Sequence, residues 1–520
     1  MDENNLKYPI GVQSFEKLRS DPRNVYIDKT RFVYELADQS APIFLSRPRR
    51  FGKSLLMSTL EAYFLGKKEL FEGLEISRLE KDWTAYPVIH IDLNVGQYEQ
   101  EGKLQRVLND VLEEEENKYG IVSKDKEDIE LRFKTLIINI QKKKSKNVVV
   151  LIDEYDKPLL ECEEHQKSDY EKTLRGFYSV LKTCDKYIRF SMLTGVARFG
   201  KISVFSALNN LKDISLSEKY NDICGVTQLE LESYFSKPIE LLAKRHGMSK
   251  QETLKQLKTM YDGYHFSDPR FSDYVYNPFS LLNCFDDLHF GEYWFDTATP
   301  RYLVKALMKT GINYDELHDI KVMENLLKGV NVPDYSAASV LYQSGYLTIK
   351  DYIPATRQYI LDFPNQEVKE GFTSVCFMVY GSKEPDTFDI SKFVRDLDQG
   401  NPANFMNRLK ALISKNPYEH SEHFEAVYHN ILFVLFTLLG YQTESECHFN
   451  KGRADMVVKT NGFVYVFEFK LDKNASEALC QIAERGYDES FIADARKIFI
   501  IGVNFSSKER NISDWTFEER

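Results

Sequence analysis

The sequence predicts an α/β protein with two separate sheet-containing parts. In the first half, buried-strand patterns are followed by residues suited to phosphate or metal, which is typical of a parallel sheet with a ligand site at its strand ends. Near the C-terminus, strand patterns joined by Asn461-Gly462 predict an antiparallel hairpin in a smaller α/β domain. With 520 residues, 43% hydrophobic and 28% charged, the chain is long enough for about two to four domains with full cores.

Composition disfavours several classes of protein. The longest largely apolar run, residues 431–439, is far shorter than the roughly 20 residues that span a bilayer, and the first ten residues are acidic and polar, so we expect neither a membrane span nor a secretion signal. Seven scattered cysteines without a CxxC spacing predict reduced thiols in a cytoplasmic protein. The net charge of −11 disfavours indiscriminate coating of nucleic acid, so any such contact must use local patches.

The stretch SRPRRFGKSLL, residues 46–56, predicts a ligand-binding loop. Residues 42–45 before it have the pattern of a buried strand, and residues 54–65 after it have that of an amphipathic helix. A phosphate-binding loop requires this context, and the stretch ends in Gly52-Lys53-Ser54 as such a loop does. Arg47 stands where the strict GxxxxGK[ST] pattern has its first glycine, so a basic turn without a ligand is the alternative.

Each part of this loop has a role if phosphate binds there. Gly52 lets the backbone come close to the ligand, and N–H groups in the turn and at the helix start surround the β-phosphate. Lys53 supplies charge to the β and γ oxygens, while Ser54 offers its hydroxyl to Mg²⁺. The candidate binding residues are Arg50, Phe51, Gly52, Lys53, Ser54 and Leu55.

Two carboxylates follow the next strand pattern. Residues 147–152 form an apolar, β-branched run typical of a strand buried on both faces, and Asp153 and Glu154 come directly after it. In an ATPase, Asp153 would hold Mg²⁺ through water and Glu154 would polarise the attacking water. The alternative is a solvated strand end before a turn, but the Gly-Lys-Ser about a hundred residues upstream favours the ligand site.

A third strand pattern covers residues 188–193 and ends at Thr194-Gly195. Thr194 would lie where a hydroxyl senses the γ-phosphate, and Arg198 follows within a turn. A Thr-Gly strand end is also common turn chemistry, so a functional and a structural role stay open for both residues.

Four stretches together resemble the AAA-ATPase-like family of bacterial proteins: RPRRFGKSL, YPIGVQSFEKLRSDPRNVYIDKT, VLIDEYDKP and LTGVARFGKISVFSALNNLKDISL. In that family the loop itself reads RPRRFGKS, so Arg47 is the family's own departure from the general pattern. The resemblance implies a P-loop ATPase core that binds ATP with Mg²⁺, followed by a helical lid. Shared ATPase sites often need a neighbour's arginine, for which Arg198 is one candidate.

The middle of the chain predicts structure without chemistry. Residues 227–243 and 250–260 have helical patterns, and residues 346–349 and 375–379 have strand-like ones. The aromatic-rich stretches 261–266 and 276–279 also resemble the family, and we interpret them as turns and core fillers of the lid rather than as nucleotide contacts.

The C-terminal hairpin gathers three ionisable side chains. Residues 419–439 have the pattern of a helix, and strand-like pieces follow at 441–445, 455–459 and 463–470. A two-residue turn at Asn461-Gly462 places Asp455 directly opposite Glu468, with Lys470 on the same face. The other face would carry Met456, Val458, Tyr465, Phe467 and Phe469.

Two opposed carboxylates repel unless something positive lies between them, and Mg²⁺ or Mn²⁺ fits there because hard cations take oxygen ligands. Lys470 would then position or help deprotonate a metal-bound water. The alternative is an exposed, salt-bridged hairpin.

This layout resembles the PD-(D/E)xK nucleases. Glu468-Phe469-Lys470 matches the ExK element, Asp455 in GRAD matches the preceding aspartate, and Glu425 on the leading helix matches an acidic metal ligand of some members. Gln481 and Tyr487 look like the downstream Gln and Tyr of certain branches, although their spacing is longer than the common QxxxY.

The predicted architecture is therefore an α/β chain: a P-loop ATPase core with helical lid, followed by a small α/β PD-(D/E)xK nuclease-like domain. Its predicted parts are the ATPase core at 1–220, the helical lid at 221–315, a connecting region at 316–412 and the nuclease-like domain at 413–520.

These patterns predict a cytoplasmic ATP-binding protein in which nucleotide state controls a metal-dependent nuclease. Its expected cofactors are ATP and Mg²⁺, or Mn²⁺ at the nuclease site, and its expected partners are nucleic acid, DNA rather than RNA, and further copies of itself, with no membrane. One alternative is a signalling or scaffold ATPase whose C-terminal domain only binds DNA or protein. Another is a nuclease with a vestigial loop.

Overall fold

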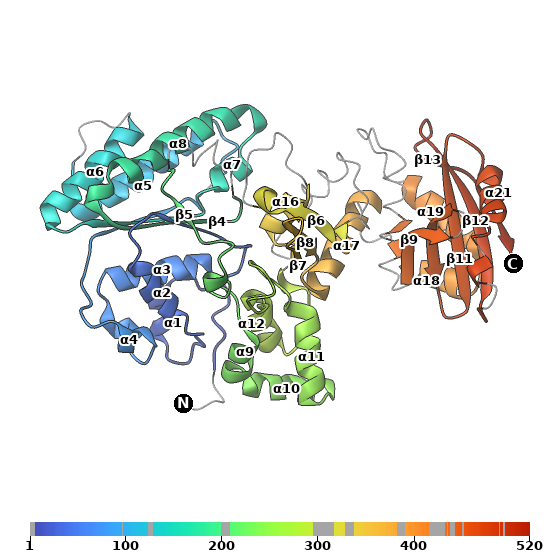
Figure 1. Ribbon diagram of the computed structural model, residues 1–520, viewed down its shortest axis with the longest axis horizontal. Coiled ribbons are helices and arrows are strands. Elements are labelled where there is room, and N and C mark those ends of the chain that lie inside the picture. Colours follow the sequence, from blue (N-terminus) through green and yellow to red (C-terminus); the bar gives the residue numbers. More distant parts are fainter. Residues whose placement is uncertain are drawn as a thin grey trace. The chain divides into compact units, whose positions relative to one another are not determined.

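The computed structural model describes residues 6–95, 97–122, 128–198, 208–294, 317–327, 337–381, 390–414, 432–433, 435–436, 442–449, 452–487, 489–491 and 494–520. The chain forms two compact units (Figure 1). The first comprises Met1–Thr297 and Ile320–Glu367, and the second comprises Ala298–Asp319 and Val368–Arg520. The predicted α/β class is confirmed, while the four-part division of the chain stays a prediction.

The first unit is built on a parallel sheet with the strand order β2-β3-β4-β1-β5. Every residue of β3 is buried, as its unbroken run of valine, leucine and isoleucine predicts. Because β4 lies between β1 and β3, the loop after β1 and the acids after β3 emerge at the same edge of the sheet. The strands are β1 (Ile43–Ser46), β2 (Val88–Asp92), β3 (Val148–Asp153), β4 (Ile188–Gly195) and β5 (Lys212–Asp213).

Helices cover both faces of this sheet. Figure 1 shows α5, α6 and α8 on one side and α1 to α4 on the other. Apolar side chains of α5, α6 and α8 form one continuous core with strands β2 and β3. The helices are α1 (Phe15–Ser20), α2 (Thr30–Ala37), α3 (Lys53–Phe64), α4 (Ile76–Leu79), α5 (Lys103–Tyr119), α6 (Ile129–Lys144), α7 (Lys157–Glu161) and α8 (Lys167–Thr183).

A helical group and a small sheet complete the first unit. The group has its own apolar core, and the predicted helix at 227–243 is divided at Phe235 into two. Its helices are α9 (Gln228–Tyr234), α10 (Ser236–His246), α11 (Lys250–Tyr261) and α12 (Pro278–Asp287). The sheet, ordered β6-β8-β7, and its helices are β6 (Ile320–Met323), β7 (Thr348–Ile353), β8 (Gln358–Asp362), α15 (Glu324–Leu327) and α16 (Ala337–Ser344).

The second unit contains a sheet with the order β13-β12-β11-β10-β9, in which only β11 and β12 pair in parallel. Helix α21 connects these two strands. The strands are β9 (Gln442–Phe449), β10 (Gly452–Lys459), β11 (Phe463–Leu471), β12 (Lys497–Ser506) and β13 (Asn511–Glu519). The helices are α17 (Gln366–Gly381), whose first two residues belong to the first unit, α18 (Ile390–Asp398), α19 (Pro402–Ser414) and α21 (Ala475–Arg485).

One secondary-structure prediction is wrong. Residues 375–379, expected to be strand-like, lie inside helix α17. A short apolar run such as VCFMV fits a buried helix as well as a strand, and its length alone does not separate the two.

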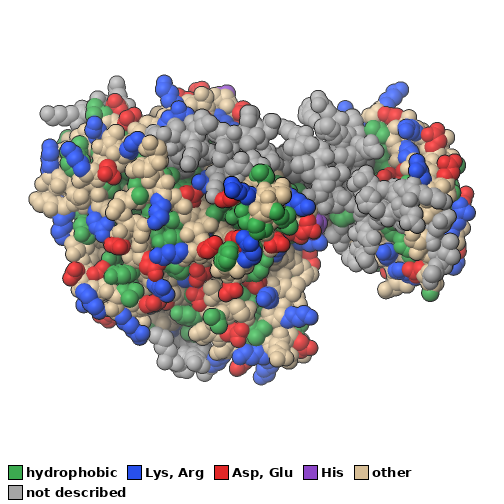
Figure 2. Space-filling model, viewed as in Figure 1, with side chains coloured by type: hydrophobic (Ala, Val, Ile, Leu, Met, Phe, Trp, Pro, Cys, Tyr) green, Lys and Arg blue, Asp and Glu red, His purple; other side chains and the backbone are tan. Residues whose placement is uncertain are grey.

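Charges of both signs are interspersed over the visible face of the described residues of the first unit (Figure 2). In the part of the chain that the structure describes, no helix has the length and apolar character needed to cross a bilayer. Five cysteines within the described ranges are free thiols: Cys162, Cys184, Cys224, Cys284 and Cys480.

Candidate functional site

The loop between β1 and α3 has the backbone of a phosphate-binding turn. Strand β1 ends at Ser46 and helix α3 begins at Lys53. Gly52 precedes the helix with φ +92°, a left-handed conformation that glycine adopts at little cost. Arg50 also has a positive φ, +67°. The loop therefore turns sharply into the start of a helix, where backbone N–H groups have no partner within the helix and suit an anion.

Lys53 is buried, with 4% of its surface exposed, and fixes the loop from inside. Its Nζ donates to the carbonyl oxygens of Arg47 and Pro48, at 3.0 and 3.2 Å. The same Nζ lies 3.6 Å from Oε1 of Glu154. Lys53 thus joins the loop to the acid that follows β3.

Arg47 points away from the loop into the protein. Its guanidinium donates to the carbonyl oxygens of Ser215 and Tyr220, at 2.8 and 2.7 Å, and its central carbon lies 4.1 Å from the centre of the Phe266 ring. Burial lowers the pKa of Arg47. In place of the missing glycine, the chain has a buried side chain that ties the loop to the segment after β5 and to the helical group.

The predicted acids and the predicted hydroxyl also come together. Asp153, the last residue of β3, is buried and accepts a hydrogen bond from Oγ1 of Thr194 on β4. Glu154 has a left-handed φ of +52°, which turns the chain immediately after the strand. Asp153 and Thr194 are thereby joined beside the Lys53–Glu154 pair.

Arg198 is engaged elsewhere. Its guanidinium pairs with Asp213 on β5, and its backbone N–H donates to Oε1 of Gln343 at 3.1 Å. A role of Arg198 in the nucleotide site, of its own chain or of a neighbouring one, therefore stays a prediction.

A cavity of about 400 Å³ opens beside the loop, within the usual range for ligand pockets. Its polar wall includes Lys53, Ser54 and Glu154. Its apolar wall comes from the N-terminal segment and from the helical group, neither of which the sequence assigned to a pocket. That wall comprises Pro9, Val12, Val25, Tyr26, Ile27, Ile223, Val226, Phe235, Pro278, Phe279, Leu281 and Leu282.

The aromatic stretches interpreted as lid core also contact the loop. Phe51 packs edge-on against Tyr264 and Phe266, with ring centres 4.7 and 5.5 Å apart, and the guanidinium of Arg50 lies 4.9 Å from the centre of the Phe279 ring. The density of tyrosine and phenylalanine in those stretches was the available signal, but residue spacing does not reveal which loop they cover.

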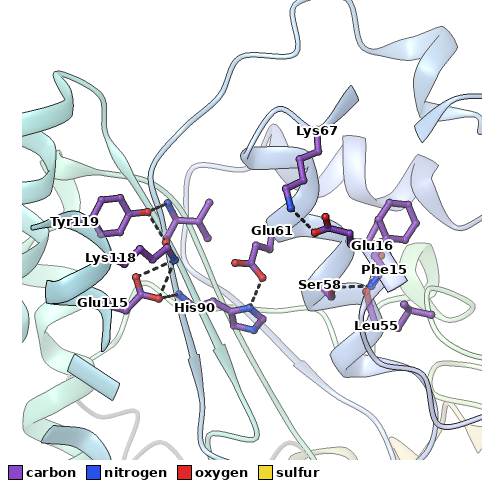
Figure 3. A network of polar contacts seen from close by, with 12 residues as sticks. Phe15, Glu16, Leu55, Ser58, Glu61, Lys67, His90, Glu115, Lys118 and Tyr119 are labelled. Carbon is purple, nitrogen blue, oxygen red and sulfur yellow. Dashed lines mark hydrogen bonds and ion pairs between the residues drawn. The ribbon is translucent and has the colours of Figure 1, made fainter. Parts of the chain in front are cut away.

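Polar contacts anchor helix α3 on two sides (Figure 3). Oε2 of Glu61 lies 2.8 Å from Nδ1 of His90 on β2, and Oγ of Ser58 accepts the backbone N–H of Phe15 at 2.9 Å. Burial would lower the pKa of His90, but the hydrogen bond to Glu61 and nearby negative charges outweigh it, so the pKa is raised. The helix behind the loop is thereby held by a hydrogen bond that becomes an ion pair where His90 is protonated.

The second candidate site lies on the β10–β11 hairpin, whose predicted register is confirmed. Met456 pairs with Phe467 and Val458 with Tyr465. Oδ2 of Asp455 accepts the backbone N–H of Phe469 at 2.7 Å, which places this carboxylate at the predicted end of the hairpin.

Glu468 is the centre of this site. It is 2% exposed, its Oε1 accepts from Nζ of Lys470 at 2.9 Å, and the same oxygen accepts from Nε2 of Gln481 on α21. Its Oε2 has no hydrogen-bond partner among the described residues. Burial and then the charge of Asp455 raise the pKa of Glu468 to about 7.

This arrangement fits a divalent cation. A buried carboxylate oxygen without a partner, next to a second carboxylate, is the donor set that Mg²⁺ or Mn²⁺ takes. The described residues contain no group of three or more His, Cys, Asp or Glu side chains that could hold a metal. Glu425, the third predicted ligand, lies outside the described residues.

Close packing of α21 brings Gln481 to Glu468. A Cβ atom on Gly502 of β12 would lie 2.2 Å from the carbonyl oxygen of Ala475 and 2.8 Å from the backbone nitrogen of Leu479, so glycine permits the helix to approach. Gln481 therefore joins the site despite its unusual spacing, whereas Tyr487 is buried in the apolar core beside Val457 and Ile482.

The folds and sites described above define a P-loop ATPase core joined to a nuclease-type domain. The family model described as predicted AAA-ATPase matches residues 9–205, and that of the PD-(D/E)XK nuclease superfamily matches residues 423–515. An uncharacterized protein in the vnfD 5′ region of Azotobacter chroococcum mcd 1 is 34% identical over 525 residues, covering 98% of this chain and 99% of that one. The chain belongs to the same family as that protein, and it carries an AAA-ATPase-like domain and a PD-(D/E)XK nuclease superfamily domain in one polypeptide.

Two solved structures from Aeropyrum pernix show a distant likeness. The ORC2 protein in its ADPNP-ADP complexes is 13% identical with a TM-score of 0.29, covering 73% of this chain and 96% of that one. The ORC1 protein in complex with DNA is 10% identical with a TM-score of 0.24, covering 66% and 91%. At these TM-scores neither likeness carries an argument about this chain.

Proposed function

We propose that the first unit binds and hydrolyses ATP, and that its nucleotide state controls a metal-dependent nuclease in the second unit. The observation that supports this most is the meeting of Lys53, Glu154, Asp153 and Thr194 at one edge of the parallel sheet, beside a cavity of about 400 Å³. The apolar wall suits a base, and the polar wall suits phosphates.

Residues of the loop and of the neighbouring strand ends would each have a separate role in hydrolysis. Lys53 would leave the carbonyls of Arg47 and Pro48 and contact the β and γ oxygens, while Glu154 would orient the attacking water. Asp153, which accepts a hydrogen bond from Thr194, would hold magnesium together with Ser54. The bound Mg²⁺ would supply charge that stabilises the phosphates during transfer.

In the second unit, Asp455 and Glu468 would hold the metal and Lys470 would position the nucleophilic water. Gln481 would orient Glu468. The bound metal would polarise the phosphodiester, for which we favour DNA over RNA.

Free thiols among the described residues support a cytoplasmic location. We also propose that further copies of the chain complete the ATPase site.

The test is cleavage of labelled DNA and RNA, single and double stranded, with Mg²⁺ or Mn²⁺ and with or without ATP. We expect Lys470→Ala to abolish cleavage and Lys53→Ala to abolish its response to ATP. Lys473→Ala, which removes an exposed lysine three positions from Lys470, is the matched control and should cleave as the wild type does.

A second candidate is a signalling or scaffold ATPase whose nuclease-like domain only binds DNA or protein. Residues 411–520 contain 12 Lys and Arg against 17 Asp and Glu, and this acidic excess weakens affinity for phosphate backbones. ATP binding by the wild type without cleavage under any condition, and without divalent metal binding at Asp455 and Glu468, would favour this candidate.

A further inference from the structure

The carbonyl groups of the phosphate-binding loop are held one after another. Lys53 takes those of Arg47 and Pro48. The next carbonyl, that of Arg49, accepts the indole N–H of Trp294 at 3.0 Å, from a residue 245 positions later in the chain. Trp294 is fully buried and does not line the cavity, so it reaches the loop from behind.

Trp294 is itself fixed. Its backbone N–H donates to Oε1 of Glu367 at 2.8 Å, and Glu367 also accepts from the hydroxyl of Ser280 at 2.7 Å. The indole packs edge-on against Tyr346, with ring centres 5.2 Å apart. Gly345 permits the close approach of the loop residue Pro48, because a Cβ there would lie 2.6 Å from Cβ of Pro48.

Holding the Arg49 carbonyl sets the direction of the next N–H group. The C=O of Arg49 and the N–H of Arg50 belong to one planar trans peptide and point in opposite directions. With the carbonyl fixed toward the buried Trp294, the N–H of Arg50 is aimed away from Trp294, in a loop whose residues 49–54 line the cavity. Backbone N–H groups so directed are what bind phosphate oxygens.

We propose that Trp294, held by Glu367, is a positioning residue for the phosphate-binding loop. Before nucleotide binds, Trp294 and Lys53 together fix the loop backbone in a chain that lacks the first glycine of the general pattern. The inference rests on the proposed function, since it concerns the affinity of the same loop for nucleotide phosphates.

The experiment uses the full chain and two readouts. Hydrogen exchange of peptides covering residues 47–55 reports on the loop without any ligand, and titration with Mg-ATP and with adenosine reports on binding. The first variant is Trp294→Phe, which keeps an aromatic ring and removes the indole N–H. The others are Glu367→Ala and Glu367→Gln, of which the second keeps an acceptor for the backbone N–H of Trp294. The control is Trp83→Phe, because the indole N–H of Trp83 donates to no other described residue.

We expect Trp294→Phe to weaken Mg-ATP binding by about five- to tenfold and to speed loop exchange by about fivefold, the effect of losing one hydrogen bond. Adenosine binding should not change, because Trp294 does not line the cavity beside the loop that would take the base. Glu367→Ala should behave like Trp294→Phe, and Glu367→Gln should behave like the wild type.

The possible failures differ from one another. The role of Trp294 would be overturned if the loop of Trp294→Phe exchanged no faster than that of Trp83→Phe. It would also be overturned if the loop exchanged faster while the affinity for ATP stayed unchanged. Equal weakening of ATP and adenosine would indicate general loss of structure and would also overturn it. A wild type that binds no ATP would overturn the proposed function, and loop exchange would then decide by itself whether Trp294 holds the loop.

Discussion

The guanidinium carbon of Arg47 lies 4.1 Å from the centre of the Phe266 ring. The same guanidinium donates to two carbonyl oxygens of the segment after β5, so Arg47 joins three parts of the first unit. A residue that interrupts the phosphate-loop pattern is therefore part of what holds the loop in place.

Arg47→Gly would recreate the strict GxxxxGKS pattern, yet we expect it to destabilise the first unit by about 3 kcal/mol or more, because buried carbonyls lose a charged donor and a cavity opens. We also expect no gain in ATP affinity. Urea unfolding and ATP titration measure the two effects. Arg357→Gly is the control, because Arg357 is exposed with φ +54° and glycine is tolerated there. An Arg47→Gly protein as stable as the wild type would contradict the anchoring role.

Glu468→Gln should stabilise the second unit when metal is removed with EDTA. The pKa of Glu468 is raised to about 7 in the folded state, so the unfolded state loses this proton first as pH rises. The free energy of unfolding therefore falls as the pH rises from the ordinary pKa of a glutamate to about 7. The variant removes that penalty, and we expect a gain of about 1–3 kcal/mol at pH 8 that shrinks toward pH 5.

Hydrogen exchange of β11 at pH 5 and pH 8 measures this gain. Glu477→Gln, an exposed site in the same unit, serves as the control and should show no gain at either pH. A Glu468→Gln protein less stable than the wild type at pH 8 would show that the carboxylate is not strained.

Gly502→Ala should cost about 2–4 kcal/mol, because the added methyl group meets the backbone of α21, which has to shift. That shift should also separate Gln481 from Glu468 and reduce any cleavage. Gly462→Ala is the matched control, since nothing lies within 4 Å of a Cβ there and we expect little change. Chemical unfolding compares the two alanines, and equal stabilities would contradict close packing of α21 on β12.

The Glu61–His90 pair should make stability depend on pH. Because the pKa of His90 is raised in the folded state, its contribution to folding stability is complete below its ordinary pKa. This contribution is lost as the pH rises through the pKa of the folded state. Burial would raise the pKa of Glu61, but the hydrogen bond to His90 outweighs it and lowers the pKa, so that its contribution is lost only at acidic pH. Besides Glu61, the carboxylates of Asp92 and Asp153 act on His90 in the same direction.

We therefore expect His90→Gln to cost about 1 kcal/mol at pH 6 and less at pH 9. A double-mutant cycle with Glu61→Gln, measured by urea unfolding at both pH values, isolates the pair. A coupling energy that is the same at pH 6 and pH 9 would show that His90 does not carry the charge.

Local patterns in the sequence predicted the elements that bear the sites. Asn461-Gly462 was enough to set the register of the hairpin, because a two-residue turn leaves only one pairing. The strand before Asp153 was evident because its apolar run is rich in β-branched valine, which favours a buried strand over a buried helix. The helix at 419–439 is described only at residues 432–433 and 435–436, which are helical.

The contacts that complete the sites were beyond reach of local patterns. The bond between Trp294 and the Arg49 carbonyl joins residues 245 positions apart, and no spacing rule connects an indole with a backbone oxygen. Gln481 looks like the downstream Gln of certain nuclease branches although its spacing to Tyr487 is unusual, and helix packing over Gly502, not that spacing, brings it to Glu468.

The ribosome makes the phosphate-binding loop long before it makes the residues that hold it. The acceptors of Arg47 lie at Ser215 and Tyr220, its ring partner at Phe266, and the donor to Arg49 at Trp294, which in turn depends on Glu367. A fragment that ends at residue 205, where the family match ends, contains the whole Gly-Lys-Ser pattern and none of these partners. We therefore expect that, during synthesis, the loop is not held by all of these partners until α17 has begun to emerge, and that helix continues into the second unit.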